Sequence, residues 1–415
     1  MKKTIMALVC LMTAGSLQAG GYRVATQGQK ALAMGHAGVA MSDSAETVFF
    51  NPGAITQLEA NADFTGGLTL LDGETQYQQQ ATLVEAETDN PLGTPINAYY
   101  ARKYSDKVSW GLGIYTPFGN KVKWPTDWAG SHLVNEIELQ SIFIQPTIAY
   151  QINDSTSIGF GPNLIIGAVE FNRNLSTSLT NADGDRSNVT IKEDNVTDIG
   201  FSLGLLHKFN QQTSLGVSYR SEVILEARGG DATFDNIPTA LQPIFTDTKF
   251  DADLPLPAEL TVGIAHRFSD QLTLAFDINR TFWDVYEELV VEFDNNVPTS
   301  VNPRNYEDAN IYRIGLQYQY DDKWTLRGGI YFDESPVPDG SFAPETPRND
   351  SIGYTAGFTY RYSQNLELDF SLLILTFDET DNSYDFYEEG GVTIPFSGTY
   401  DSAANSIGFG LSYKY

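Results

Sequence analysis

Residues Ile407 to Tyr415 read IGFGLSYKY, and two kinds of side chain alternate strictly along them. Every odd-numbered position carries a large apolar or aromatic side chain, whereas the even-numbered positions carry glycine, serine or lysine. A strand with hydrocarbon on one face and an aqueous lumen on the other must alternate in this way. Residues 312–320 and 352–362 follow the same pattern with several tyrosines near their ends, which favours an aromatic girdle at a membrane interface.

The spacing of such segments separates a membrane barrel from a soluble β-sandwich, whose strands also alternate. The connections are in turn tight, as at Asp321-Asp322, and long, as at 229–255, which is typical of an outer-membrane barrel with periplasmic turns and external loops. The sequence therefore predicts an all-β fold, a 14-stranded antiparallel transmembrane β-barrel over residues 62–415. The predicted strands are 62–71, 95–105, 107–116, 137–151, 155–172, 194–209, 212–228, 256–267, 271–293, 309–320, 323–333, 351–362, 365–377 and 404–415.

Residues 1–19 have the order of a secretory signal peptide. Two lysines precede an apolar stretch, and a small-residue cleavage site ends at Ala19. We expect a processed chain that begins at Gly20. Cys10, the single cysteine of the sequence, lies in the apolar stretch, so the processed chain has no cysteine and no disulfide.

The composition excludes several classes of protein. With 53 acidic against 25 basic side chains, the formal net charge of −28 argues against a nucleic-acid partner, because phosphate neutralisation needs clustered lysine and arginine. A hydrophobic content of 41% and an aromatic content of 12% exclude disorder. Beyond the first twenty residues the sequence lacks runs of roughly 18 apolar residues, which excludes a bundle of transmembrane helices.

Residues 20–61 do not alternate, and we predict that they form a small plug in the barrel lumen. Unlike an ordinary polar periplasmic tail, they carry apolar side chains such as Leu32, Val48 and Ile55 among many small residues. Apolar side chains of this kind favour burial. A barrel of fourteen strands is wide enough to need filling if it is not to leak.

Several motifs between residues 21 and 338 form a recognisable set. The predicted plug contains Gly21-Tyr22, Gly35 to Gly38, and Thr47-Val48-Phe49-Phe50-Asn51-Pro52, and further motifs lie at 219–223, 254–257 and 312–338. This set resembles the FadL-type long-chain fatty-acid transporters, a family that includes the TodX-type aromatic-hydrocarbon channels, and the plug resembles the family's hatch. The family's hatch motif is Asn-Pro-Ala, whereas Gly53 stands third here, which should loosen the backbone without removing the turn.

The resemblance implies transport of hydrophobic molecules across the outer membrane, long-chain fatty acids above all. In the family, the solute is captured between external loops, reaches a site against the hatch and leaves sideways through the barrel wall. Hatch residues Tyr22, Asn51, Pro52 and Gly53 are then the candidates for gating. Lateral exit suits an oily solute, which prefers hydrocarbon to water by about 0.8 kcal/mol per methylene. A channel for neutral aromatic hydrocarbons remains an alternative.

The fourth long loop is the candidate for extracellular capture. Its apolar residues are spaced by three or four, so an amphipathic helix with one apolar face is one interpretation and an ordinary loop minicore is the other. The third loop, around 181–188, is short and polar, whereas the family usually pairs two bulky apolar loops. The sequence therefore does not predict a full-sized capture groove. The candidate capture residues are Phe234, Ile237, Leu241, Ile244 and Phe245.

The third strand is the candidate for the lateral opening, because in the family a kink in that strand opens the wall. Gly111 and Gly113 can accept irregular dihedral angles, and Pro117 cannot donate to a ladder. Glycines on luminal faces are common in this chain, so ordinary strand structure is the alternative.

A fatty-acid carboxylate needs a cation. The resemblance places Arg304 where the family has a basic residue near its pocket, and alternation points Arg220, Arg313 and Arg327 into the lumen as further headgroup candidates. They can equally pair with luminal carboxylates such as Asp277. Because the net charge repels anions at long range, either a local arginine binds the headgroup or the solute is neutral.

Other functions receive little support from the sequence. None of the four histidines stands beside a nucleophile motif, so we predict no enzyme activity, and two aspartates flanking Gly184 are too few for a calcium site, so we predict no metal and no cofactor. A structural or adhesive barrel is the alternative of another class, although it would need no apolar plug. We expect a monomer in the bacterial outer membrane whose other partners are membrane lipid and lipopolysaccharide.

Overall fold

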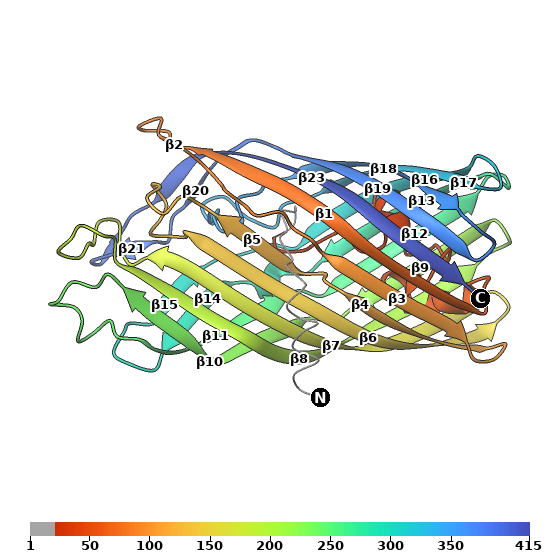
Figure 1. The fold of residues 1–415 in the computed structure, drawn as a ribbon, viewed down its shortest axis with the longest axis horizontal. Helices are drawn as coiled ribbons and strands as arrows, with labels where there is room; N and C mark the ends of the chain where they lie inside the picture. The colour runs from red at the N-terminus through yellow and green to blue at the C-terminus, as the bar shows by residue number, and fades with distance from the viewer. Residues whose placement is uncertain (1–20) are drawn as a thin grey trace.

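The computed structural model describes residues 21–415, so the predicted signal peptide, Cys10 and Gly20 lie outside the described residues. The chain forms a closed antiparallel barrel with fourteen strands in its wall (Figure 1). The first and last wall strands close it, with Asp63 paired to Lys414 at one end of their ladder and Gln78 to Thr399 at the other. Among the described residues, the helices are too short or too polar to span a membrane.

The ladders give the order of the wall strands, and the predicted barrel of fourteen strands is confirmed. The wall strands are β1 (Ala62–Gln78), β3 (Ile96–Lys103), β4 (Val108–Tyr115), β6 (Glu136–Asn153), β7 (Thr156–Asn174), β8 (Asn188–Lys208), β9 (Thr213–Arg220), β12 (Glu259–Arg267), β13 (Leu272–Thr281), β16 (Ala309–Gln319), β17 (Trp324–Asp333), β18 (Ser351–Arg361), β19 (Leu366–Phe377) and β23 (Phe396–Lys414).

Four neighbouring wall strands are extended toward the end of the barrel that carries the long loops. Short strands complete the same end, which lies on the left in Figure 1. The extensions are β10 (Val223–Asp235), β11 (Thr248–Leu256), β14 (Glu288–Phe293) and β15 (Ser300–Pro303), and the short strands are β2 (Glu85–Glu87), β5 (Gly119–Lys123), β20 (Thr380–Tyr384), β21 (Glu388–Glu389) and β22 (Val392–Thr393).

Two of the predicted strands are wrong in their continuity. The stretch 212–228 is divided into β9, which ends at Arg220, and β10, which begins at Val223. The stretch 271–293 is divided, because β13 ends at Thr281 and the short 3-10 helix η2 (Trp283–Val285) precedes β14. Trp283 is fully buried, and its ring meets that of Tyr22 edge-on at a centroid distance of 4.8 Å. Burying this large side chain against the N-terminal segment turns the strand inward.

The outer face of the barrel is apolar, and its inner face lies against the chain's own N-terminal segment. In β23, Ile407, Phe409 and Leu411 are 41%, 52% and 42% exposed and face outward. The intervening Gly408 faces inward, where a Cβ would lie 1.9 Å from the side chain of Gln29. The alternation of large and small residues in this strand therefore reflects hydrocarbon on one side and close packing on the other.

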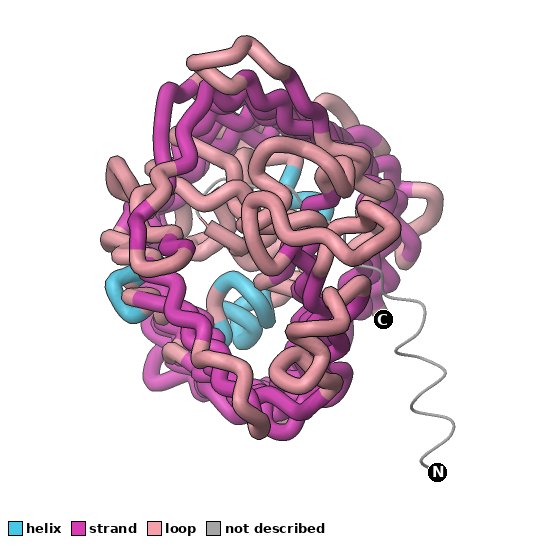
Figure 2. The backbone as a smooth tube through the Cα atoms, turned by 90° about the vertical axis from the view of Figure 1, so that its left-hand side faces the viewer, coloured by secondary structure: helices cyan, strands magenta, loops and turns pink. Residues whose placement is uncertain are grey.

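Residues 21–61 lie inside the ring of strands. Viewed from the loop end, their short helices occupy the bore (Figure 2). They are α2 (Gln29–Leu32), α3 (Thr47–Phe50) and the 3-10 helix η1 (Pro52–Gln57). Nearly every residue from 21 to 40 is buried, as the apolar content of the segment requires. We call residues 21–61 the hatch.

Candidate ligand cavity and hatch

A large apolar cavity lies between the hatch and the loop end of the barrel. Together with the space that opens to solvent, it encloses about 1290 Å³. Strands β6, β7, β8, β10, β11 and β14 contribute aliphatic and aromatic side chains to its lining, among them Leu139, Phe171, Val196, Leu225, Phe250 and Val291. A cavity of this size and character suits a long hydrophobic molecule better than a polar one.

The polar end of the cavity has a small positive charge. Its described lining contains three charged side chains, Arg173, Arg304 and Glu345. Arg304 forms an ion pair with Glu345 and donates a hydrogen bond of 3.1 Å to the hydroxyl oxygen of Tyr384. Although burial opposes it, the Glu345 carboxylate raises the pKa of Arg304, which keeps this guanidinium charged. The Arg173 guanidinium donates to Ser300 Oγ at 2.9 Å and has no carboxylate partner in the described chain.

The structure distributes the four predicted headgroup arginines over three places. Arg304 alone among them lines the described cavity. Arg220 pairs with Glu259 at 2.7 Å and lies over the ring of Phe49 in the hatch. Arg327 donates to Gln317 and Thr359. Arg313 lies with Arg220 in a smaller polar cavity beside the hatch.

Sequence reasoning missed Arg173. It stands at the end of β7, where the predicted third loop begins, so alternation gave no indication of its direction. Its partner Ser300 lies 127 residues further along the chain. The contact depends on tertiary structure that no local pattern encodes.

Tyr22 connects the start of the hatch to the cavity. Its ring lines the cavity and meets Tyr286 edge-on at 5.6 Å, and its hydroxyl donates to the carbonyl oxygen of Pro255. The backbone beside it is bonded to the chain just beyond the third strand, since Val24 N donates to Pro117 O at 2.7 Å. Gly119 N in turn donates to Tyr22 O at 2.9 Å. Tyr22 therefore lies where the ligand cavity, the hatch and the third strand meet.

Asn51 holds the hatch to the barrel wall. Its side-chain nitrogen donates to Val39 O at 2.8 Å and to Leu205 O at 2.9 Å, and its oxygen accepts from Gly53 N at 3.0 Å. Pro52 begins η1, where its missing N–H costs nothing. Gly53 is buried, and an added Cβ would lie 2.8 Å from Gly204 O in β8. Gly53 is therefore explained by the close approach of the hatch backbone to the wall, and not by a need for a more flexible backbone at this turn.

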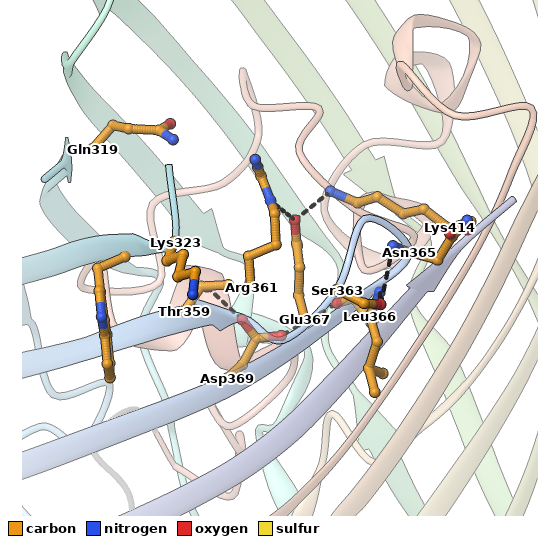
Figure 3. A network of polar contacts seen from close by, with 12 residues as sticks. Gln319, Lys323, Thr359, Arg361, Ser363, Asn365, Leu366, Glu367, Asp369 and Lys414 are labelled. Atoms are coloured by element: carbon orange, nitrogen blue, oxygen red, sulfur yellow. Dashed lines mark hydrogen bonds and ion pairs between the residues drawn. The ribbon is translucent and has the colours of Figure 1, made fainter. Parts of the chain in front are cut away.

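Ion pairs fix the hatch at two further places. Lys30 Nζ lies 2.6 Å from Glu367 of β19, and Arg23 lies 3.1 Å from Asp333 of β17. Glu367 also pairs with Arg361 and Lys414, as Figure 3 shows. Buried pairs of this kind are costly to break singly, because removing one partner leaves an uncompensated charge.

Glu46 is a buried carboxylate within the hatch. One oxygen accepts from Ala31 N at 3.1 Å, and the other has no hydrogen-bond partner. Burial raises the pKa of Glu46 to about 7, although the nearby ammonium of Lys30 opposes the shift. The hatch therefore contains a group that titrates near neutral pH.

The third strand shows no irregularity at Gly111 and Gly113, and its role in a lateral opening stays a prediction. Strand β4 is regular through Tyr115 and pairs with β3 and β6. A Cβ on Gly111 would lie 2.7 Å from Val48 of the hatch, so this glycine makes room for the hatch. The ladder with β3 ends at Ile114, and two residues after the end of β4 the carbonyl oxygen of Pro117 accepts from the hatch instead.

The fourth long loop is a minicore rather than an amphipathic helix. Residues 236–247 form turns, since Pro238 and Pro243 interrupt any longer helical ladder. Phe234 packs against Phe245 at a centroid distance of 5.6 Å, and Ile237 is buried beside them. Leu241 and Phe245 pack against the same core, whereas Ile244 is 41% exposed.

Comparison with known proteins identifies the family. A family model described as "Outer membrane protein transport protein (OMPP1/FadL/TodX)" matches residues 10–415. The chain belongs to this family. It is 23% identical over 404 residues to the long-chain fatty acid transport protein of Escherichia coli strain K12, with 88% of this chain and 90% of that protein covered.

Solved structures of the family show the same fold. A FadL homologue from Pseudomonas aeruginosa superposes with a TM-score of 0.83 at 16% identity, covering 95% of this chain and all of that one. The toluene transporter TbuX of Ralstonia pickettii gives 0.69 at 19% identity, with 94% and 98% covered. The family member described here is therefore an outer-membrane barrel that transports hydrophobic molecules.

Proposed function

We propose that this family member transports long-chain fatty acids, which bind in the apolar cavity with the carboxylate at Arg173. The observation that carries the proposal is the charge of the cavity. Arg304 is neutralised by Glu345, whereas Arg173 has no carboxylate partner among the described residues. One net positive charge at the end of an apolar cavity is complementary to a fatty-acid anion.

The cavity supplies the affinity for the alkyl chain. Each methylene transferred from water to such a lining contributes about 0.8 kcal/mol. The formal net charge of −28 repels an anion at a distance, but salt screens this repulsion beyond about 10 Å. The local arginine then decides binding at short range.

The proposed path runs from the loop end to the cavity, past Tyr22, and out through the wall beside Pro117. Tyr22 lines the cavity, its carbonyl oxygen accepts from Gly119 N, and the nearby Val24 N donates to Pro117 O. Displacement of the Tyr22 ring by a ligand would therefore reach the wall directly. Asn51, Pro52 and Gly53 would hold the rest of the hatch during this change. The buried minicore around Phe234 would order the external loop at the cavity entrance.

Arg173→Gln tests the headgroup assignment. We expect the variant to bind palmitate at least about tenfold more weakly, since a charge-assisted hydrogen bond contributes about 1.5–3 kcal/mol. Hexadecanol, which has the same chain length and no charge, should bind to the variant as tightly as to the wild type. Isothermal titration in detergent micelles measures both ligands, and Arg304→Gln in parallel separates the paired arginine. Equal losses for the acid and the alcohol would contradict the assignment.

A neutral hydrocarbon is the second candidate substrate. It is favoured by the pairing of Arg304 with Glu345, which leaves little free charge in the cavity. In that case a monoaromatic hydrocarbon would compete with palmitate, and Arg173→Gln would leave the binding of the hydrocarbon unchanged.

A further inference from the structure

The barrel wall contains a second interruption, far from Pro117 in sequence. Strand β8 pairs with β9 from Ser202 to Lys208 and with β10 from Asn188 to Lys192. Between these ladders, residues 193–201 and 221–230 share no ladder pair among the residues described. A hydrogen bond of 2.9 Å from Ser221 N to Phe201 O marks the end of this gap that lies farther from the loop end of the barrel. We call residues 193–201 and 221–230 the seam.

Side chains accept hydrogen bonds from three backbone amides on the β8 edge of the seam. Asn195 N donates to the carboxylate of Glu193 at 3.1 Å, and Ile199 N donates to that of Asp198 at 2.6 Å. Phe201 N donates to Ser221 Oγ at 2.9 Å. Unpaired edge amides in a membrane are costly, so these local partners let the two strands stay apart.

The seam lies between the ligand cavity and the outer surface. Val196 and Leu225, one from each edge, are 6% and 4% exposed and line the cavity. Ile199 and Ile224, again one from each edge, are 71% and 40% exposed on the outside. Apolar side chains therefore extend through the wall on both edges.

The seam also reaches the hydrophobic band of the barrel. Ile199 continues the outward row of Phe201 and Leu203, which are 38% and 43% exposed. Toward the loop end the edges become polar, with Glu193 on β8 and Glu226 on β10. The part of the seam farther from the loop end therefore faces hydrocarbon, and the part nearer the loop end faces the polar surface.

We propose that the seam is a second lateral portal, through which a hydrophobic ligand passes between the cavity and the hydrocarbon of the membrane. Opening it requires movement of the side chains of Val196, Leu225 and Val223, the last of which packs against Gly200 on the opposite edge. It breaks no backbone ladder, since none joins the edges there. The proposal rests on the proposed transport of hydrophobic molecules. It adds a route that does not involve the third strand.

A cross-link across the seam tests the portal. Ile199→Cys with Ile224→Cys places one thiol on each edge, and the processed chain has no other cysteine. A flexible bis-maleimide closes the pair in protein reconstituted into vesicles, and uptake of a fluorescent fatty acid is measured. The control pair Ile330→Cys with Tyr354→Cys spans an intact ladder between β17 and β18. In the wild type, Ile330 is 41% exposed and Tyr354 is 50% exposed.

The portal predicts that the initial rate of uptake falls in proportion to the cross-linked fraction of the seam pair and stays constant for the control pair. Uptake that is independent of cross-linking in both pairs would overturn the portal. Wild-type vesicles that take up no more than protein-free vesicles would instead refute the proposed transport. A fatty acid with a terminal diazirine gives a second readout, because adducts at 196–199 and 223–225 support the portal and their absence beside adducts elsewhere in the cavity opposes it.

Discussion

Glu46 is a single hatch residue whose ionisation is coupled to stability. Its pKa is about 7 in the folded protein because it is buried, against an ordinary value of 4.5. Between these values the folded protein holds more protons than the unfolded chain, so stability falls as the pH rises from about 4.5 to about 7. The ionised carboxylate has one oxygen without a partner, which is the structural origin of this cost.

Glu46→Gln should remove this pH dependence. The amide imitates the protonated acid, so the variant should match the wild type at pH 5 and be more stable at pH 8. The midpoint of urea unfolding in detergent, measured at both pH values, checks this. Glu59→Gln, at an exposed hatch position, is the control and should show no such divergence. A constant difference between Glu46→Gln and the wild type would contradict the prediction.

Asn51 should tolerate neither loss nor isosteric change. Alanine leaves Val39 O and Leu205 O without their donor, which should lower the free energy of unfolding by about 1–3 kcal/mol. Asn51→Asp keeps the acceptor for Gly53 N but sets a carboxylate against two carbonyl oxygens, so it should be at least as damaging. Urea unfolding measures both variants. An aspartate variant as stable as the wild type would show that these bonds do not hold the hatch.

At the scale of elements, the hatch packs so closely against strand β8 that only a glycine fits in the wall at the contact. A Cβ on Gly204 of β8 would lie 2.3 Å from Asn51 Oδ1 and 2.6 Å from Gly53 N. Gly204→Ala should therefore displace η1 from the wall and raise single-channel conductance in planar bilayers. Gly328→Ala is the matched control, because the nearest atom to its Cβ is 3.8 Å away. Equal conductance in both variants would contradict the prediction.

Local patterns predicted the elements that depend on local causes. Alternation is a property of each strand and its two environments, so fourteen strands and their turns could be predicted. The division of 271–293 could not, because it arises when Trp283 turns inward to meet Tyr22, a residue far away in the chain. The resemblance named Arg304 as a headgroup candidate, but its ion pair with Glu345 was not predicted, since that pair joins two separate loops.

At the scale of the whole molecule, the apolar outer face should determine insertion. Ile314 is 51% exposed on β16, between the outward-facing Tyr312 and Tyr318. Ile314→Arg should lower the free energy of unfolding in lipid vesicles by about 2–4 kcal/mol, whereas Tyr320→Arg beside the turn should cost about 0–1 kcal/mol. Equal costs at the two sites would show that Ile314 does not face the hydrocarbon interior.

The hatch is fastened at both ends. Its beginning is hydrogen-bonded to Pro117 and Gly119, and its end continues directly into β1. Lys30 and Asn51 also hold the segment between these ends to the wall, so we expect a ligand to displace the hatch locally rather than expel it into the periplasm. The space that this displacement can open limits the diameter of the ligand. A narrow alkyl chain should therefore pass, whereas a bulky polar antibiotic should be excluded.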